Sequence, residues 1–329
     1  MKNIVICCDG TGNEYSENNT NVVETYAICR KSPDQVVFYD PGVGTGGWEY
    51  SDGKGPGKDS IKALSDQATG EGLQNNVNDA YGFLMETYEA GDQVYLFGFS
   101  RGAFTVRSLA GMLYKVGLLP ADNDNLIPYA AKLYNIEGNL PLAHGFRDTF
   151  SRRCPIHFIG VWDTVDSLAM NAGKKWHSGK LNPEVSTAYH AVSIDEKRTD
   201  FKPNLFDDSA ANLHPGQVVE QVWFSGVHAN VGGWYDERGL SNITLHWMLE
   251  NARNYGLKID DNALNQRIPD AHDKLYNSRK GLWLARGTYK RIIPAGSKVH
   301  ETVFVRKQRP SNKYKPKNLL ARSQYTVVS

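Results

Sequence analysis

The stretch Val94-Tyr-Leu-Phe-Gly98-Phe99-Ser100-Arg101-Gly102-Ala103-Phe104 places a serine between two glycines, where one hydrophobic pattern gives way to another. Residues 94–97 form a short apolar run with aromatic and β-branched members, which is typical of a buried strand. After the serine, apolar residues recur at spacings of three and four, which predicts an amphipathic helix. The glycines allow the strand and the helix to approach closely, so we expect Ser100 on a sharp turn between them.

Gly-x-Ser-x-Gly is the pattern of a nucleophile elbow, in which a strained turn presents the serine hydroxyl to a substrate. Because the pattern is short, a second interpretation stays open, in which Ser100 only caps the following helix. The two interpretations differ in their consequence for activity. A capping serine could be replaced by alanine without loss of hydrolysis.

Length and composition set limits on the fold and on the partners. The 329 residues are 40% hydrophobic, which suffices for a sizeable core, and we predict one enlarged α/β domain over residues 1–329. The 37 basic and 36 acidic residues nearly cancel. Bulk charge therefore gives no reason to expect a nucleic acid partner, and a lipid or a small ester is the expected substrate. The oligomeric state is not indicated by the sequence.

The start of the chain has too short an apolar run for a signal peptide, and no stretch approaches the roughly 20 apolar residues of a membrane span. We therefore expect a cytoplasmic protein, for which export would need a signal-independent route. The four cysteines lack metal-ligand spacing, and the adjacent Cys7 and Cys8 would point to opposite faces of a strand. We expect reduced, partly buried thiols, no bound metal and no cofactor.

Six short apolar runs end in polar or glycine-rich turns, and helical patterns lie between some of them. The expected strands are 4–8, 36–39, 94–99, 156–162, 188–194 and 222–224, and further helical patterns cover 73–88 and 245–252. This alternation predicts a mostly parallel sheet with helices on both faces. Three segments have less regular patterns, and we expect them to be lid or rim insertions: 42–57, 118–153 and 166–186.

The residues at the ends of the expected strands suit nucleophilic catalysis. Ser100, Asp163 and His228 each follow such a strand, and ligands of parallel sheets bind beyond the carboxyl ends of the strands. A serine hydroxyl needs an imidazole to accept its proton, and the imidazole needs a carboxylate to fix its tautomer. We therefore assign Ser100 as nucleophile, Asp163 as acid and His228 as base. This chain order is the one expected for α/β-hydrolases.

Two further aspartates compete for the carboxylate role. Asp236 is the rival of Asp163, although its surroundings, Tyr235-Asp-Glu-Arg-Gly239, resemble a surface turn. Asp166 is a weaker candidate.

A tetrahedral intermediate also needs backbone N–H donors for its oxyanion. We expect one from Arg101, directly after the nucleophile, and a second from Gly10 or Thr11 in the loop Asp9-Gly-Thr-Gly-Asn13. Asp9 is a secondary candidate, which either pairs with Arg101 or contributes to a cation site.

Five motifs carry a resemblance to a known family and together span nearly the whole chain. They are Cys8-Asp-Gly-Thr-Gly-Asn13, Tyr39-Asp-Pro-Gly-Val-Gly44, Gly98-Phe-Ser-Arg-Gly-Ala103, Gly160-Val-Trp-Asp-Thr-Val165 and Trp223-Phe-Ser-Gly-Val-His-Ala-Asn-Val-Gly-Gly233. They resemble the bacterial and fungal α/β-hydrolase domain family that includes type VI secretion phospholipase effectors. The resemblance implies an α/β-hydrolase fold, a Ser-Asp-His triad at the positions assigned above, and in some members phospholipase activity against competitors.

Together these observations predict a serine hydrolase that cleaves carboxylic esters through an acyl-enzyme, with a phospholipase or lipase as the first expectation. The alternatives are an esterase or thioesterase acting on small or protein-linked acyl groups, and a non-catalytic binding module that keeps the fold.

The last 27 residues, 303–329, contain seven basic and no acidic residues. This segment is a candidate for peripheral contact with an anionic membrane. The alternative is a solvated tail without a specific role.

Overall fold

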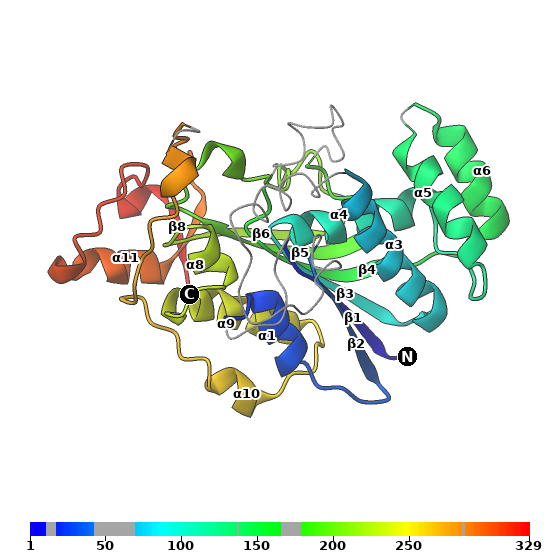
Figure 1. The fold of residues 1–329 in the computed structure, drawn as a ribbon, viewed down its shortest axis with the longest axis horizontal. Coiled ribbons are helices and arrows are strands. Elements are labelled where there is room, and N and C mark those ends of the chain that lie inside the picture. Colours follow the sequence, from blue (N-terminus) through cyan, green and yellow to red (C-terminus); the bar gives the residue numbers. More distant parts are fainter. Residues whose placement is uncertain (11–17, 43–69, 137, 166–178, 285–286) are drawn as a thin grey trace, which may run out of the picture.

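The computed structural model describes residues 1–10, 18–42, 70–136, 138–165, 179–284 and 287–329. In this part of the chain eight strands form one sheet in the order β2-β1-β3-β4-β5-β6-β7-β8, and all neighbours are parallel (Figure 1). The strands are β1 Asn3–Cys8, β2 Gln35–Asp40, β3 Gln93–Phe99, β4 Ile156–Trp162, β5 Val185–Ser193, β6 Val218–Phe224, β7 Lys298–His300 and β8 Thr326–Val328. The parallel sheet and its first six strands confirm the sequence prediction.

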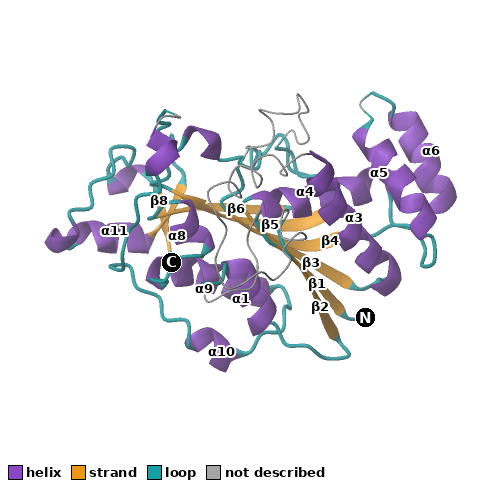
Figure 2. Cartoon of the chain, in the orientation of Figure 1, coloured by secondary structure: helices purple, strands orange, loops and turns teal. Residues whose placement is uncertain are grey.

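Helices cover both faces of the sheet (Figure 2). One face carries α3 Gly70–Thr87 and α4 Arg101–Val116, with α5 Ile127–Asn135 and α6 Leu140–Phe150 packed beside them. The other face carries α1 Asn21–Ile28, α8 His228–Gly232, α9 Gly239–Asn254 and α10 Asp261–Asn265. Cys8 lies in the first core and Cys7 in the second, as the alternation of a strand predicts. All four cysteines are free and buried.

The direction in which the sheet grows reverses between β1 and β3. β2 pairs with one side of β1, and β3 pairs with the other side. In open α/β sheets, such a switch point is where the loops diverge and ligands bind. The two residues that follow these strands are Asp9 and Ser100.

The turn after β3 depends on both glycines that flank the serine. A Cβ atom on Gly102 would lie 2.0 Å from the carbonyl oxygen of Cys8, and one on Gly98 would lie 2.5 Å from the carbonyl oxygen of Gly102. Both distances are far below any tolerable contact. The start of α4 therefore packs directly on the end of β1, which fixes the position of Ser100 between the two strands.

The predicted insertion 118–153 is more regular than its sequence suggested, because it forms α5 and α6. Its two ends are joined by an antiparallel bridge between Leu118 and Arg152. They lie between the end of α4 and the start of β4, at the edge of the sheet opposite Ser100. This placement does not support a lid role. The predicted insertions 42–57, beyond Gly42, and 166–186, up to residue 178, lie outside the described residues.

The C-terminal segment is folded and is not a free tail. β7, β8 and α11 Glu301–Gln308 extend the sheet and cover its end. Their core includes Val299, Val303, Phe304, Tyr314 and Tyr325. Of the seven basic residues, Arg306 is buried and the other six are exposed. None of the helices in the described residues is long and apolar enough to cross a membrane.

Candidate active site

Ser100 occupies a strained turn between β3 and α4. Its backbone has φ 58° and ψ −117°, a conformation that L-residues rarely adopt. The side chain makes no capping hydrogen bond to the helix, which contradicts the alternative in which Ser100 serves as a side-chain cap. The backbone N–H of Ser100 donates to the carbonyl oxygen of Trp162, the last residue of β4, at 3.1 Å.

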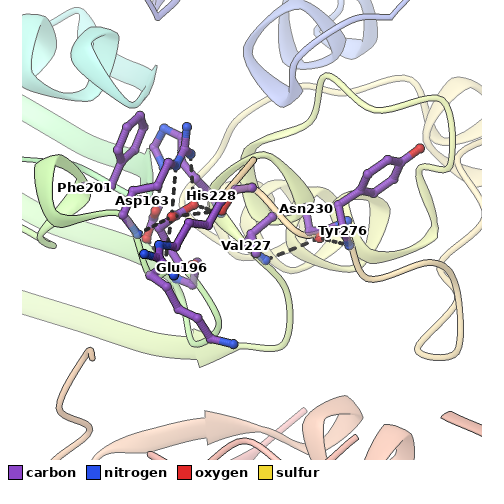
Figure 3. A network of polar contacts seen from close by, with 12 residues as sticks. Asp163, Glu196, Phe201, Val227, His228, Asn230 and Tyr276 are labelled. Carbon is purple, nitrogen blue, oxygen red and sulfur yellow. Dashed lines mark hydrogen bonds and ion pairs between the residues drawn. The ribbon is translucent and has the colours of Figure 1, made fainter. Parts of the chain in front are cut away.

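Asp163 follows Trp162 directly and contacts His228 (Figure 3). The Oδ2 atom of Asp163 lies 2.6 Å from Nδ1 of His228, and its Oδ1 atom accepts a hydrogen bond of 2.9 Å from the backbone N–H of Ser193. Asp163 is completely buried and has a positive φ of 40°. The structure thus brings together two of the three residues assigned to a triad, from β4 and from the start of α8.

The charges of this pair are set by its surroundings. Burial alone would raise the pKa of Asp163, but the charge of Arg291 and the hydrogen bond from His228 together hold that pKa well below its usual range. Burial lowers the pKa of His228 below its usual value, against the opposing effect of Asp163. At neutral pH the carboxylate is therefore ionised and the imidazole neutral, which are the states that proton transfer from a serine requires.

Arg291 was not identified from the sequence. Its Nη1 lies 2.5 Å from Oδ1 of Asp163 and its Nη2 lies 3.0 Å from Oδ2, so the two side chains form a bidentate ion pair. Neither side chain is exposed to solvent. The same guanidinium donates to the carbonyl oxygens of Ser193, at 2.8 Å, and Phe201, at 2.7 Å. A basic residue next to the apolar pair Ile292 and Ile293 was the only sequence signal.

A second carboxylate, Glu196, contacts the backbone of His228. Its Oε2 accepts a 3.2 Å hydrogen bond from the backbone N–H of His228. Burial would raise the pKa of Glu196, but Arg198, bound at 2.9 Å, lowers it to about 2. The rings of Phe99 and Phe201 pack against the imidazole with centroids 4.6 and 4.9 Å away. These contacts, none of them predicted, hold the imidazole ring in place.

His190 supports the loop that carries Asp163. It is completely buried in β5, and burial together with the charge of Arg107 lowers its pKa to about 3, so it is neutral. Its Nε2 accepts a 3.1 Å hydrogen bond from the backbone N–H of Thr164, and its Nδ1 lies 3.3 Å from Oε1 of Gln221. The backbone donor at Nε2 implies that the proton is on Nδ1.

Two of the three predicted oxyanion donors can be located. The backbone N–H of Arg101 is in the first turn of α4, where helical N–H groups have no partner within the helix. The N–H of Gly10 donates to Oδ1 of Asp9 at 2.7 Å, so it would serve an oxyanion only after that bond breaks. Thr11 lies outside the described residues. Asp9 is buried and accepts from Thr20 at 2.6 Å and from Tyr39 at 3.2 Å.

The rival carboxylate Asp236 makes no contact with His228 among the contacts of the described residues. Asp236 is exposed, and its Oδ1 accepts a hydrogen bond from Asn18 at 2.5 Å. Asp166 lies outside the described residues. Among the side chains that the structure describes, no group of three or more His, Cys, Asp or Glu residues is arranged to hold a metal ion.

Ser100 and His228 lie at the same edge of the sheet, and the ring before the serine, Phe99, touches the imidazole. No hydrogen bond joins the Ser100 hydroxyl to His228 among the contacts of the described residues. In sites without substrate such bonds are often long, and they shorten when the substrate binds.

One curated relative matches this chain in sequence. The uncharacterized protein YEL023C of Saccharomyces cerevisiae is 33% identical over 222 residues, which cover 62% of this chain and 33% of the yeast protein. The chain therefore spans about a third of the length of that relative.

Three solved structures are similar at low identity. An uncharacterized protein from Pseudomonas aeruginosa has 17% identity and a TM-score of 0.49, over 82% of this chain and 49% of that one. The Tle1 effector bound to the VgrG spike of the type 6 secretion system has 16% identity and a TM-score of 0.39, over 71% of this chain and 51% of the effector chain. Zea mays acyl-protein thioesterase 2 has 12% identity and a TM-score of 0.37, over 76% of this chain and 93% of the thioesterase. These likenesses are too distant to carry an argument about function.

A match to a protein family covers most of the chain. The family is described as the type VI secretion phospholipase effector, Tle1-like, catalytic domain, and its model matches residues 2–251. This range includes Ser100, Asp163 and His228, whereas Arg291 lies beyond it. The chain belongs to the family of Tle1-like phospholipase effector catalytic domains.

Proposed function

We propose that this chain is a serine hydrolase that cleaves carboxylic esters through an acyl-enzyme, with Ser100 as nucleophile, His228 as general base and Asp163 as the carboxylate that orients it. Family membership supports a lipase- or esterase-type hydrolase. The observation that carries the finer assignment is the 2.6 Å contact between Asp163 and His228, at the edge where β3 ends in Ser100.

In this mechanism the Ser100 hydroxyl attacks the ester carbonyl carbon while His228 Nε2 accepts its proton. The negative charge that develops on the carbonyl oxygen is stabilised by the backbone N–H of Arg101 and a second donor. His228 then gives the proton to the leaving alcohol, and the acyl group stays on Ser100. A water molecule, deprotonated by His228, releases the acid and restores the serine. Throughout, Asp163 stabilises the imidazolium that forms.

We propose phospholipids as the substrate class, supported by the family to which the chain belongs. Small esters, thioesters and acylated proteins are the competing substrates. A non-catalytic binding module is the competing function, but such a module would not need a neutral imidazole paired with an ionised carboxylate beside a strained serine.

A fluorophosphonate probe tests the nucleophile. The wild-type protein should be labelled at Ser100 and should hydrolyse p-nitrophenyl esters. Ser100→Ala should do neither, while Asp236→Asn serves as a matched control at an exposed carboxylate and should behave like the wild type. Absence of both labelling and hydrolysis in the wild type would favour the binding module. Comparison of lipids from cells that express the wild type or Ser100→Ala then separates phospholipids from the other substrates.

The exposed basic residues of the C-terminal segment support peripheral binding to an anionic membrane. Lys313, Lys315 and Lys317 are exposed, as is the nearby apolar side chain of Leu320. Replacement of the three lysines by glutamate should abolish sedimentation with phosphatidylglycerol vesicles at low salt and leave hydrolysis of a soluble ester unchanged. Equal sedimentation of both proteins would contradict membrane contact through this segment.

Family membership also supports delivery by a type VI secretion system, a route that uses no signal peptide. The test is the appearance of the protein outside cells with an active system and its retention in cells without one. Retention in both would contradict delivery by this route.

A further inference from the structure

We propose that Arg291 is a positioning residue for the triad, one that fixes the orientation of Asp163 and keeps the Asp163–His228 pair free of an extra proton at moderately acidic pH. The inference rests on the proposed function, because it assigns the pair to catalysis. It concerns a residue 40 positions beyond the end of the family match at residue 251. The part of the chain beyond the family match is then part of the active site.

The geometry of the ion pair supports an orienting role. Both oxygens of Asp163 are bound by the planar guanidinium, so the carboxylate cannot rotate without losing one of two charge-assisted hydrogen bonds. This restraint fixes Oδ2 at the position where it meets Nδ1 of His228. Lysine has a single ammonium group and cannot reproduce the two-pronged contact.

The guanidinium is itself held in place from several sides. Its two other hydrogen bonds go to the backbone carbonyls of Ser193, at the end of β5, and Phe201. The backbone at Arg291 is also held by hydrogen bonds, because the side chain of Asn318 donates to the carbonyl oxygens of Arg291 at 3.2 Å and Ile194 at 2.9 Å. Arg291 is therefore preorganised before substrate binds.

Arg291 also balances the charges around the imidazole. The charged and titratable groups near the pair are Glu196 and Arg198 from the loop after β5, His190 from β5, Arg107 from α4, and Arg291. Glu196 and Arg198 neutralise each other, and His190 is neutral. Arg107 donates to the carbonyl oxygen of Asn204, whereas Arg291 contacts Asp163 directly and offsets its charge. Without it, a proton would bind to the Asp163–His228 pair more readily, and the base would be lost at a higher pH.

The experiment compares Arg291→Met, Arg291→Gln and Arg291→Lys with the wild type. The midpoint of His228 protonation is measured by NMR of the imidazole, and the acidic limb of kcat/KM is measured with a soluble ester. Both neutral variants should raise the midpoint by about one to two pH units. Arg291→Lys should return it to within a few tenths of a unit of the wild type, yet keep a reduced kcat because the carboxylate is held by one contact. Arg291→Gln retains N–H donors and serves if the methionine variant does not fold.

Arg306→Met is the matched control. Arg306 is another buried arginine beyond the family match, but it donates to the backbone carbonyls of Ala271 and Asp273. Its loss should lower stability without moving the His228 midpoint. An unchanged midpoint in Arg291→Met and Arg291→Gln would overturn the inference. The NMR measurement does not depend on turnover. Hydrolysis by Ser100→Ala would therefore refute the proposed function, while the His228 midpoint would still test the role of Arg291 by itself.

Discussion

The backbone N–H of Ser100 donates to the carbonyl oxygen of Trp162 at 3.1 Å. This bond continues the pairing of β3 with β4 by one step and joins the two strand ends that lead into Ser100 and Asp163. The relative position of the proposed nucleophile and the proposed acid is therefore set by the backbone of the sheet. Replacement of the Ser100 side chain, which makes no capping hydrogen bond, should therefore alter chemistry with little effect on the fold.

The contact of Asp163 with His228 makes Asp163→Asn the most direct test of the acid. An amide at this position can donate to Nδ1 and so favour the wrong imidazole tautomer, and we expect kcat to fall by about 10³–10⁴-fold. Steady-state kinetics with a soluble ester measures the loss. Asp236→Asn should keep kcat within about twofold, because Asp236 is exposed and bonded to Asn18. Comparable losses in the two variants would argue against Asp163 as the orienting carboxylate.

The close packing of α4 on β1 predicts that Gly102→Ala destabilises the protein by about 3 kcal/mol, since the added methyl group would meet backbone atoms that cannot move aside. Gly145→Ala is the control. It lies within α6 and a Cβ there would have no neighbour within 4 Å, so helix propensity should make it neutral or stabilising by up to about 1 kcal/mol. Urea unfolding measures both, and a Gly102→Ala protein as stable as the wild type would contradict the packing.

The buried histidines His190 and His300 each contribute a loss of stability as pH falls from about 6.5, as does His228. The carboxyl of Asp40, whose pKa burial raises to about 7, contributes in the opposite direction. Burial lowers the pKa of His190 to about 3 and of His300 to about 4. Between these values and 6.5 each of these two histidines binds more protons in the unfolded chain than in the folded one, so its titration favours unfolding in acid, by at most about 1.4 kcal/mol per pH unit for each group. Asp163, with its lowered pKa, adds to the loss only below about pH 4.

Urea unfolding at pH 7.5, 6 and 5 measures this slope. His190→Gln should reduce it, since glutamine does not titrate in this range, whereas His214→Gln at an exposed position should leave it unchanged. A slope that is the same in the wild type and His190→Gln would show that His190 titrates normally in the folded state.

The four thiols should be unreactive in the folded protein. All are buried, and burial raises the pKa of Cys29 and of Cys154 to about 12, so little thiolate forms at pH 8. A thiol-specific chromogenic reagent should report no fast reaction in buffer and four equivalents in denaturant. Rapid labelling of one or more cysteines without denaturant would indicate local opening of the hydrophobic core.

The sequence was most informative where elements are long. Strands such as β3 and β4 are seven residues long and mostly apolar, and α4 repeats its apolar positions over four turns. Each of these patterns identifies an element without knowledge of its neighbours. The assignment of Ser100 and Asp163 followed, because each comes directly after such a strand, whereas His228 lies four residues beyond the end of β6.

The remainder could not be predicted because its signals are short or arise only in three dimensions. β7 and β8 have three residues each, and α8 has five, too few for a periodic pattern. Arg291 is 128 residues from Asp163 in sequence, and Glu196 is 32 residues from His228. Nothing local in either segment marks the partner, so the arginines that balance the two carboxylates were found only in the structure.

The sheet extends beyond the residues that the family model matches, so the matched range is shorter than the folded domain. The family match ends within α9, while β7 pairs with β6 through Val222 and Trp223 and β8 completes the edge. A protein shortened to the matched range would expose the backbone of β6 as an open edge, a common cause of aggregation. Failure of such a shortened protein to express in soluble form would then reflect the loss of β7 and β8 from the sheet, and not a missing activity. For members of this family, domain boundaries are better chosen from strand pairing than from sequence similarity.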